Sequence, residues 1–362
     1  MPKFKLNPRD HSSLLPSLPQ GANVLVIRLR SIGDVVLTTP ALAALHAWRP
    51  DLRIRVLLAR FCMPLLEGNP AVTEVIEWRG FWPTVRELRK RKFSIVYNMH
   101  GGPASALLTG FSGAPVRVCW AGRQYSFLYN VHAPDESRNR SMHTVEQRFK
   151  QLHWTGLPVA PIPASYIYPQ EDAVEYVRHR LSQKGIAPGV RYAVLRPGAS
   201  GAQKLWPVEK FAGIARWLRE ERGIVPVVNL GPADQGLVEE VRKHLDPVSV
   251  RIDSLDLRRA TALLAGASLF VGNDTGPTHM AAALSRPCVV VFGNTPSAVW
   301  GPWRTDHRVV ENAFPCGHCA LASQGGCENF PGSFCILSVT VDQVRAACEA
   351  LLDAVAYRTR VG

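Results

Sequence analysis

Polar residues able to bind an anion are concentrated in the segment VGNDTGPTHMAAALSRPCVVVF, residues 271–292. The pattern predicts a strand, a polar turn, a short helix and a second strand. Proline suits a first helical position because its missing N–H is unpaired there anyway, and the unpaired amides and dipole of that turn favour a phosphate group. The alternative is an ordinary turn whose aspartate caps the helix. The residues predicted to form the anion site are Asp274, Thr275, Gly276, Pro277, Thr278 and His279.

Three other polar loops follow apolar, strand-like runs: RSIGD (30–34), RPGASGAQK (196–204) and GPAD (231–234). In open α/β sheets ligands bind beyond the carboxyl ends of the strands, so we expect these loops and the turn at 273–279 to converge on one cleft. The sequence has no G-x-G-x-x-G after a strand and no P-loop motif. A dinucleotide-dependent dehydrogenase and a P-loop NTPase are therefore disfavoured.

Two charged residues in these loops suit a nucleotide-sugar donor, which needs partners for its diphosphate and its ribose. Lys204, in a glycine-containing loop, would oppose the charge of the diphosphate as the glycosidic bond breaks. Asp234 would accept hydrogen bonds from the ribose hydroxyls. The alternatives are a surface lysine at 204 and a helix-capping carboxylate at 234.

Asp34 is the predicted base for an acceptor hydroxyl, because it follows Gly33 just after the first strand-like run. Glycine lets the backbone approach a ligand closely. The alternative is that Asp34 caps the following helix. A helix N-terminus lowers the pKa of a carboxylate, which would keep Asp34 ionised but make it a weaker base.

Alternating strand-like and helix-like segments must position these loops. The predicted strands are NVLVIRL (23–29), RIRVLLA (53–59), VTEVIEW (72–78), FSIVYNM (93–99), VRVCWA (116–121), YAVLRPG (192–198) and VPVVNLG (225–231). Predicted helices include one that Thr39 caps and Pro40 begins, one over 206–223, one over 237–245 and a final one from about 339. Repeated βα units predict two doubly wound parallel sheets of the α/β class, that is, two Rossmann-like domains facing a central cleft.

The segment TGLPVAPIPASYIYPQ (155–170) is rich in proline and lacks periodicity, so it is the predicted linker between the domains. The predicted organisation is a loose leader (1–22), an N-terminal domain (23–160), a C-terminal domain (171–340) and a C-terminal helix (341–362).

Charge is unevenly distributed along the 362 residues. The net charge is +13, of which residues 1–150 contribute +11, with a cluster at Arg86, Arg89, Lys90, Arg91 and Lys92. Such an excess of positive charge attracts a phosphorylated substrate, anionic lipid or nucleic acid. The alternative is that the cluster is the solvated face of a helix. Aromatic residues are not interleaved with it, which makes nucleic acid the weaker choice. No apolar run is long enough to cross a bilayer and no secretory signal is expected, so the predicted location is the cytoplasm.

Four of the eight cysteines form the pattern C-x2-C-x7-C-x7-C. The spacing is compatible with a closed, structural zinc site, but the second pair lacks a tight C-x-x-C knuckle, so zinc is left open. The four residues are Cys316, Cys319, Cys327 and Cys335.

Three segments together resemble the glycosyltransferase family 9 heptosyltransferases of lipopolysaccharide core synthesis. They are RSIGDVVLTTPALAAL (30–45), RPGASGAQKLWPVEKFAGIA (196–215) and VGNDTGPTHMAAALSRPCVVVFGNT (271–295). The resemblance covers nearly the whole chain from residue 24. It implies the GT-B fold and an inverting transfer of heptose from ADP-heptose to a lipid-A-linked core acceptor, without a cofactor or metal at the active site.

Site roles also follow from the resemblance. Asp34 would be the general base, with Arg30, Ser31 and Gly33 beside it on the acceptor side. Lys204 and the turn from Asp274 to His279 would hold the donor, and Asp234 its ribose. Arg196 stands where many relatives have histidine, which bears on which donor and acceptor are used.

The basic N-terminal half suits a phosphate-bearing acceptor at an anionic surface, so we expect peripheral contact with the inner face of the inner membrane and no nucleic-acid partner. A loop-rich stretch at 123–148, with Arg138, Arg140 and His143, either closes over the acceptor or is a plain surface loop. The remaining alternatives are a transferase for another nucleotide sugar, a nucleotide-sugar epimerase and a non-catalytic nucleotide-sugar-binding protein.

Overall fold

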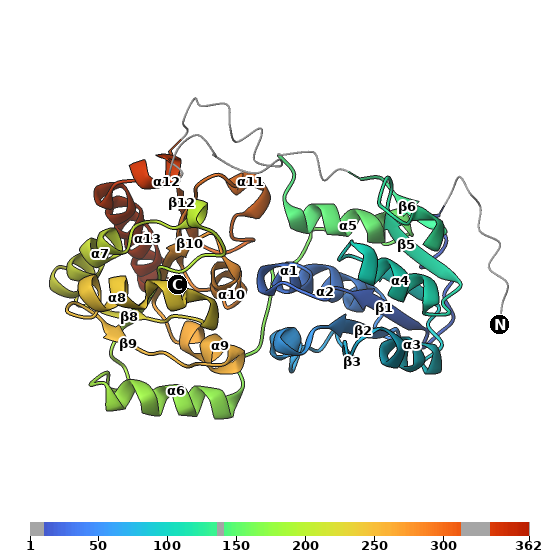
Figure 1. Cartoon of the computed structure of the whole chain (residues 1–362), viewed down its shortest axis with the longest axis horizontal. Helices are drawn as coiled ribbons and strands as arrows, with labels where there is room; N and C mark the ends of the chain where they lie inside the picture. Colours follow the sequence, from blue (N-terminus) through green and yellow to red (C-terminus); the bar gives the residue numbers. More distant parts are fainter. Residues whose placement is uncertain (1–10, 136–140, 313–333, 362) are drawn as a thin grey trace. The chain divides into compact units, whose positions relative to one another are not determined.

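A computed structural model describes residues 11–135, 141–312 and 334–361 of the chain. The chain divides into two compact units, Met1–Tyr168 and Pro169–Gly362. Each unit contains one six-stranded sheet in which all paired neighbours run parallel. The α/β architecture of two Rossmann-like units is confirmed (Figure 1).

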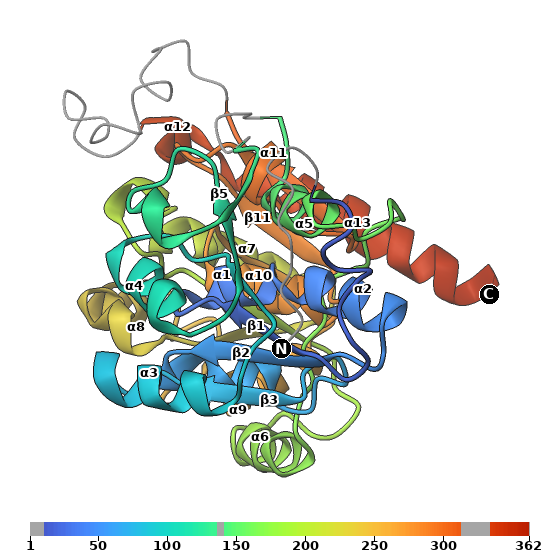
Figure 2. The same ribbon diagram turned by 90° about the vertical axis from the view of Figure 1, so that its right-hand side faces the viewer.

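The first unit has the strand order β3-β2-β1-β4-β5-β6. Its strands are β1 (Asn23–Ile27), β2 (Arg53–Leu58), β3 (Glu74–Glu77), β4 (Ile95–Asn98), β5 (Val116–Trp120) and β6 (Val131–Ala133). Its helices are α1 (Ile32–Val36), α2 (Thr39–Trp48), α3 (Phe81–Lys90), α4 (Pro103–Phe111) and α5 (Thr144–Trp154), with the 3-10 turns η1 (Arg60–Leu66) and η2 (Ser126–Leu128). Helices α3 and α4 pack together on one side of the sheet, and α2 and α5 on the other (Figure 2).

The second unit repeats this plan with the order β12-β11-β10-β7-β8-β9. Its strands are β7 (Tyr192–Arg196), β8 (Val225–Val228), β9 (Val250–Arg251), β10 (Leu269–Asn273), β11 (Cys288–Val291) and β12 (His307–Val310). Its helices are α6 (Glu171–Gln183), α7 (Val208–Glu220), α8 (Val238–His244), α9 (Leu257–Ala265), α10 (Gly276–Ala283), α11 (Ser297–Trp300), α12 (Phe334–Ser338) and α13 (Val341–Val361), with η3 (Ala202–Lys204) and η4 (Pro232–Leu237). Helix α13 packs on α7 and β12, so it belongs to the body of this unit.

Central strands are buried along their whole length, as continuous apolar runs in parallel sheets require. All five residues of β10 and all four of β11 are buried. The hydrophobic core of the second unit includes the side chains of Trp206, Phe211 and Val271. Burial on both faces explains why these strands read as uninterrupted apolar segments in the sequence.

The predicted strands and the strand–helix–strand unit at 269–291 are confirmed, but three of the strands were not expected: β6, β9 and β12. The prediction that Thr39 caps α2 is wrong by one residue, because Thr38 is the N-cap and the Thr39 hydroxyl donates to the Val36 carbonyl at 2.7 Å. In the stretch 123–148, Arg138 and Arg140 lie outside the described residues, whereas His143 caps α5 by accepting from the Val145 amide at 3.2 Å. No helix in the described ranges is long and apolar enough to span a bilayer.

Candidate functional site

Each sheet has a point where the connections reverse direction, between β1 and β4 in the first unit and between β7 and β10 in the second. Ligands of doubly wound folds bind beyond the carboxyl ends of strands at such points. In the second unit these ends are Arg196 and Asn273. The side-chain Nδ2 of Asn273 donates to the Pro197 carbonyl at 2.8 Å, which joins the two loops directly. The loops 196–204 and 273–279 are therefore brought together.

Lys204 and Asp274 form the charged centre of this edge. The Lys204 Nζ donates to the Asp274 Oδ2 at 2.6 Å, and the Thr295 hydroxyl donates to the same oxygen at 2.7 Å. Asp274 is buried and does not cap α10, whose N-cap is Thr275. The helix-cap alternative for Asp274 is therefore wrong, and Lys204 is a partly buried, ion-paired lysine. Thr295 was not predicted.

The start of α10 presents fewer free amides than the sequence suggested. Pro277 has no N–H, and the Thr278 amide donates to the Thr275 carbonyl at 3.1 Å. The amides of Thr275 and Gly276 donate to no residue in the described part of the chain. Of the six residues predicted to form the anion site, two therefore offer a backbone amide without a described partner, Thr275 and Gly276. His279 lies in the same turn and is buried.

Asp234 is paired within the protein. Its Oδ2 lies 2.7 Å from the Arg196 Nη2 and accepts the Gly231 amide at 2.7 Å. The capping alternative for Asp234 is thus partly right, since it satisfies an amide at the start of η4. No described residue donates to Oδ1, and a Cβ at Gly198 would lie 2.1 Å from that oxygen. Burial lowers the pKa of Arg196, although the nearby Asp234 acts in the opposite direction.

In the first unit, Asp34 lies just beyond β1 and is held by two arginines. Its Oδ1 accepts from the Arg148 Nη2 at 2.5 Å and forms an ion pair with Arg28. The Ser31 hydroxyl donates to Oδ2 at 3.0 Å, and Arg148 also donates to the Asp34 carbonyl at 2.6 Å. Arg28 in turn donates to the Met99 carbonyl just beyond β4. The network therefore spans the switch point of this sheet.

The electrostatics of this network decide the charge of Asp34. Burial alone would raise its pKa, but the charges of Arg148 and Arg28 and the hydrogen bonds from Arg28 and Ser31 hold it well below the ordinary value. Burial and the charge of Arg28 lower the pKa of Arg148 to about 9. Burial and the same arginine lower the pKa of His100 to about 4. Asp34 is thus an anion and His100 is neutral at physiological pH.

The three residues predicted to lie beside Asp34 on the acceptor side differ in their exposure to solvent. Arg30 and Ser31 are exposed, whereas Gly33 is buried within α1. Sequence reasoning missed Arg28, Arg148 and His100. Arg28 had a visible signal, since it is a charged residue directly after a buried apolar strand. That the two units face each other across one cleft stays a prediction.

The family model for "Glycosyltransferase family 9 (heptosyltransferase)" matches residues 82–324, about two thirds of the chain. The chain belongs to glycosyltransferase family 9. It is therefore a glycosyltransferase, an enzyme of the heptosyltransferase family associated with lipopolysaccharide core synthesis.

Relatives of this family 9 member support the assignment along most of its length. It is 27% identical to lipopolysaccharide heptosyltransferase 3 of Escherichia coli over 295 residues, covering 76% of this chain and 84% of that protein. It is 26% identical to lipopolysaccharide heptosyltransferase 2 of E. coli K12 over 352 residues, covering 91% and 98%. The solved structure of the E. coli ADP-heptose lipopolysaccharide heptosyltransferase II has the same fold, with a TM-score of 0.77, 24% identity and coverage of 92% and 99%.

Most of the late cysteine cluster lies outside the described residues. This holds for Cys316, Cys319 and Cys327, whereas Cys335 is buried in α12. No group of three or more histidine, cysteine or acidic side chains suited to a metal occurs among the residues that the structure describes. The zinc site therefore stays a prediction.

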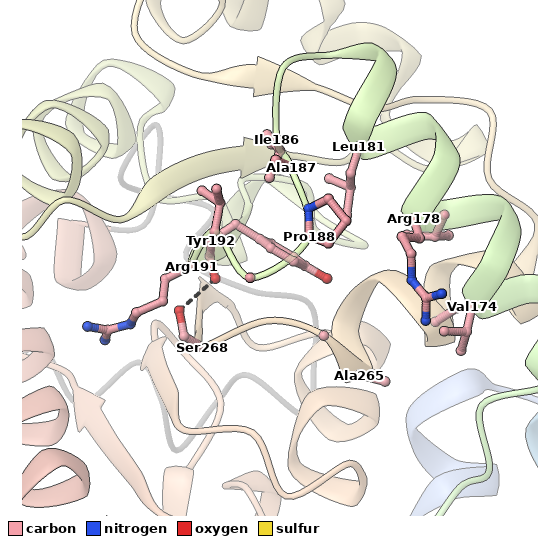
Figure 3. A pocket seen from close by; sticks show the side chains of 15 residues that line it. Val174, Arg178, Leu181, Ile186, Ala187, Pro188, Arg191, Tyr192, Ala265 and Ser268 are labelled. Carbon is pink, nitrogen blue, oxygen red and sulfur yellow. Dashed lines mark hydrogen bonds between the residues drawn. The ribbon is translucent and has the colours of Figure 1, made fainter.

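The second unit also contains a cavity, seen from close by in Figure 3. It is lined by α6, Pro188, Tyr192 and Ser268, whose hydroxyl donates to the Tyr192 carbonyl at 2.8 Å. Tyr192 begins β7 and Arg196 ends it. Five residues of strand span roughly 15 Å, so this cavity is at the amino edge of the sheet, opposite the Lys204–Asp274 pair.

Proposed function

We propose that this family 9 enzyme transfers heptose from ADP-heptose to a lipid-A-linked lipopolysaccharide core, with inversion at the anomeric carbon. One observation carries the donor half of the proposal: Lys204 and the free amides of Thr275 and Gly276 lie at the switch point between β7 and β10. Cations and helix-terminal amides together are the usual partners of a diphosphate. The E. coli protein named as an ADP-heptose transferase shares this fold.

At the donor end, the diphosphate accepts hydrogen bonds from Thr275 and Gly276 and lies against Lys204. Asp274 holds the lysine amine in place at 2.6 Å, so the cation is oriented before the donor binds. Such preorganised donors stabilise charge that develops on a leaving group without reorganisation. Asp234 keeps its Oδ1 for a ribose hydroxyl while its Oδ2 stays with Arg196. Lysine and amides thus take the part that a metal plays elsewhere.

At the acceptor end, Asp34 removes the proton of the attacking hydroxyl. The acceptor oxygen forms a bond to the anomeric carbon, the bond from that carbon to the ADP oxygen breaks, and ADP leaves with the electron pair. The carboxyl group of Asp34 takes the proton. Because its low pKa makes it a weak base, the transfer comes late, when the bonded hydroxyl has become acidic.

The charge around Asp34 favours an anionic acceptor. Arg28 and Arg148 give the network one positive charge in excess of the carboxylate, and Arg30 is exposed beside it. A phosphorylated core sugar would be attracted by that excess. This supports a lipid-linked, phosphate-bearing acceptor reached from the cytoplasmic face of the inner membrane.

The test is the mass of the product formed on heptose-deficient lipopolysaccharide with ADP-heptose or with other ADP- and UDP-sugars as donor. We expect a gain of one heptose with ADP-heptose alone. A gain with a different donor would replace the donor assignment and keep the transferase. Conversion of the donor without acceptor would favour an epimerase, and binding without turnover would favour a non-catalytic protein.

A further inference from the structure

Three aromatic rings form an exposed cluster where α3 and α4 of the first unit meet. Phe81 lies 4.9 Å from Trp82 and 5.6 Å from Phe111 between ring centroids, and Trp82 lies 6.3 Å from Phe111. Phe81 also packs on the core, which anchors the cluster. Trp82 is nevertheless 62% exposed, and Phe111 is partly exposed. A large aromatic held in this way on a rigid base, yet open to solvent, calls for a functional reason.

The apolar surface continues along α4. Leu107, one helical turn before Phe111, is exposed on the same face. The turn η2 packs on α4 and carries Phe127, which is 79% exposed and lies 6.4 Å from Tyr125 between ring centroids. Helices α3 and α4 lie side by side on one side of the sheet (Figure 2), so the aromatic surface, defined as Phe81, Trp82, Leu107, Phe111, Tyr125 and Phe127, belongs to one unit.

Basic side chains flank these rings on α3. Arg86, Arg89 and Lys90 follow Trp82 by four, seven and eight positions, which places them on its side of the helix. All three are exposed, and the Arg89 Nε donates to the Phe111 carbonyl at 3.0 Å. Arg86 and Lys90 make no ion pair with any residue of the described ranges. Arg91, by contrast, is paired with Glu74 and Glu87 and is unavailable to a partner.

We propose that this surface docks on an anionic phospholipid bilayer, with the aromatic rings entering the interfacial region and the three basic side chains contacting phosphate groups. Exposed aromatics beside lysine and arginine are the combination that binds such interfaces, and each feature alone is weak. The proposal rests on the proposed function and deepens it, because a lipid-anchored acceptor must be reached at the membrane surface.

A second copy of this chain is the less suitable occupant. The unit carrying the surface has a large positive charge, +11 over residues 1–150, and self-association would bring two such fields together. An anionic bilayer instead neutralises the charge. The chemistry of the surface therefore favours lipid.

The test measures co-sedimentation of the full chain with phosphatidylglycerol-containing and pure phosphatidylcholine vesicles. We expect binding to the anionic vesicles that weakens as salt is raised. The double variant R86E/K90E should lower the partition coefficient by at least about tenfold, since each basic side chain near the surface contributes a several-fold factor. Trp82→Ser should lower it several-fold at unchanged charge.

Matched controls come from the second unit. Arg216→Glu on α7 and Tyr357→Ser on α13 change exposed side chains of the same kinds and should leave binding unchanged. Equal losses in the controls, or no binding by the wild-type chain, would overturn the proposal. A concentration-dependent dimer abolished by Trp82→Ser would show that another copy covers the surface.

Vesicle binding needs no turnover, so its outcome is separate from that of the proposed function. Binding without heptose transfer would refute the function and keep the surface. Transfer to a soluble, delipidated acceptor without vesicle binding would keep the function and refute the proposed surface. For R86E/K90E we expect transfer to the delipidated acceptor at the wild-type rate, and transfer to vesicle-embedded acceptor to fall with the partition coefficient.

Discussion

Replacing Lys204 by methionine should separate the structural and chemical parts of the Lys204–Asp274 pair. The side chain of Lys204 is 21% exposed and that of Asp274 is 6% exposed. Breaking a fully buried pair costs about 3–5 kcal/mol, whereas an exposed pair contributes at most about 1 kcal/mol. Because Thr295 still donates to the carboxylate, we expect an intermediate loss of about 2 kcal/mol in the free energy of unfolding. For a unit of this size that lowers the Tm by about 6 °C.

The effect on catalysis should be larger than the effect on stability. Loss of one preorganised donor to a developing charge lowers kcat by about 10²–10³-fold. The assay is acceptor-dependent ADP release, with thermal unfolding followed in parallel. Lys210→Met is the control, since the Lys210 amine donates only to the carbonyls of Leu337 and Val339 among the described residues. It should leave kcat unchanged.

A variant of the partner residue Asp274 separates the ion pair from the lysine amine. Asp274→Asn removes the ion pair but leaves the Lys204 amine, so kcat should fall by less than about tenfold although stability falls. The double variant K204M/D274N should recover part of the lost stability, because no unpaired buried carboxylate remains, but none of the lost rate. A kcat for Lys204→Met within about threefold of wild type would refute the assignment of Lys204 to the leaving group. So would recovery of the rate in the double variant.

Three further predictions follow from the same contacts. Arg148→Met removes a positive charge that lowers the pKa of Asp34. The acid limb of the kcat/KM profile, which lies below about pH 4 in wild type, should therefore move to higher pH. An unmoved limb would argue against Asp34 as the base. Gly198→Ala places a Cβ 2.1 Å from the Asp234 Oδ1. It should lower the free energy of unfolding by about 2 kcal/mol in thermal unfolding and weaken ADP binding in calorimetry. Gly236→Ala, whose Cβ meets nothing within 4 Å, should do neither. EDTA should leave the rate of heptose transfer unchanged, because lysine and amides oppose the diphosphate charge; a rate that falls on chelation and returns with a divalent cation would contradict this.

The sequence predicted those parts of the fold that depend on local pattern. Continuous apolar runs such as those of β1 and β10 mark strands buried on both faces, and Pro277 marks the start of α10. The strand β9 has only two residues, both partly exposed, so it leaves no periodic signal. Its pairing with β8 is set by the sheet and not by its own residues.

The site residues that could be predicted lie in recognisable polar loops. The turn at Asp274 and the loop of Asp34 could be recognised because their chemistry is contiguous. The partner Arg148 is 114 positions from Asp34, on α5, and no local pattern connects the two. A charged residue that directly follows a buried strand, as Arg28 follows β1, was the overlooked signal. A buried charge at that position requires a carboxylate partner, which the fold supplies.

The most direct test of the account is acceptor-dependent ADP release from ADP-heptose by wild type and Asp34→Asn. The control is Asp51→Asn, which alters another arginine-paired aspartate of the same unit. The account predicts that Asp34→Asn binds donor as wild type does but loses about 10²–10⁴-fold in acceptor-dependent release, while the control keeps its rate. Release by Asp34→Asn at the wild-type rate would contradict the central claim that Asp34 deprotonates the acceptor.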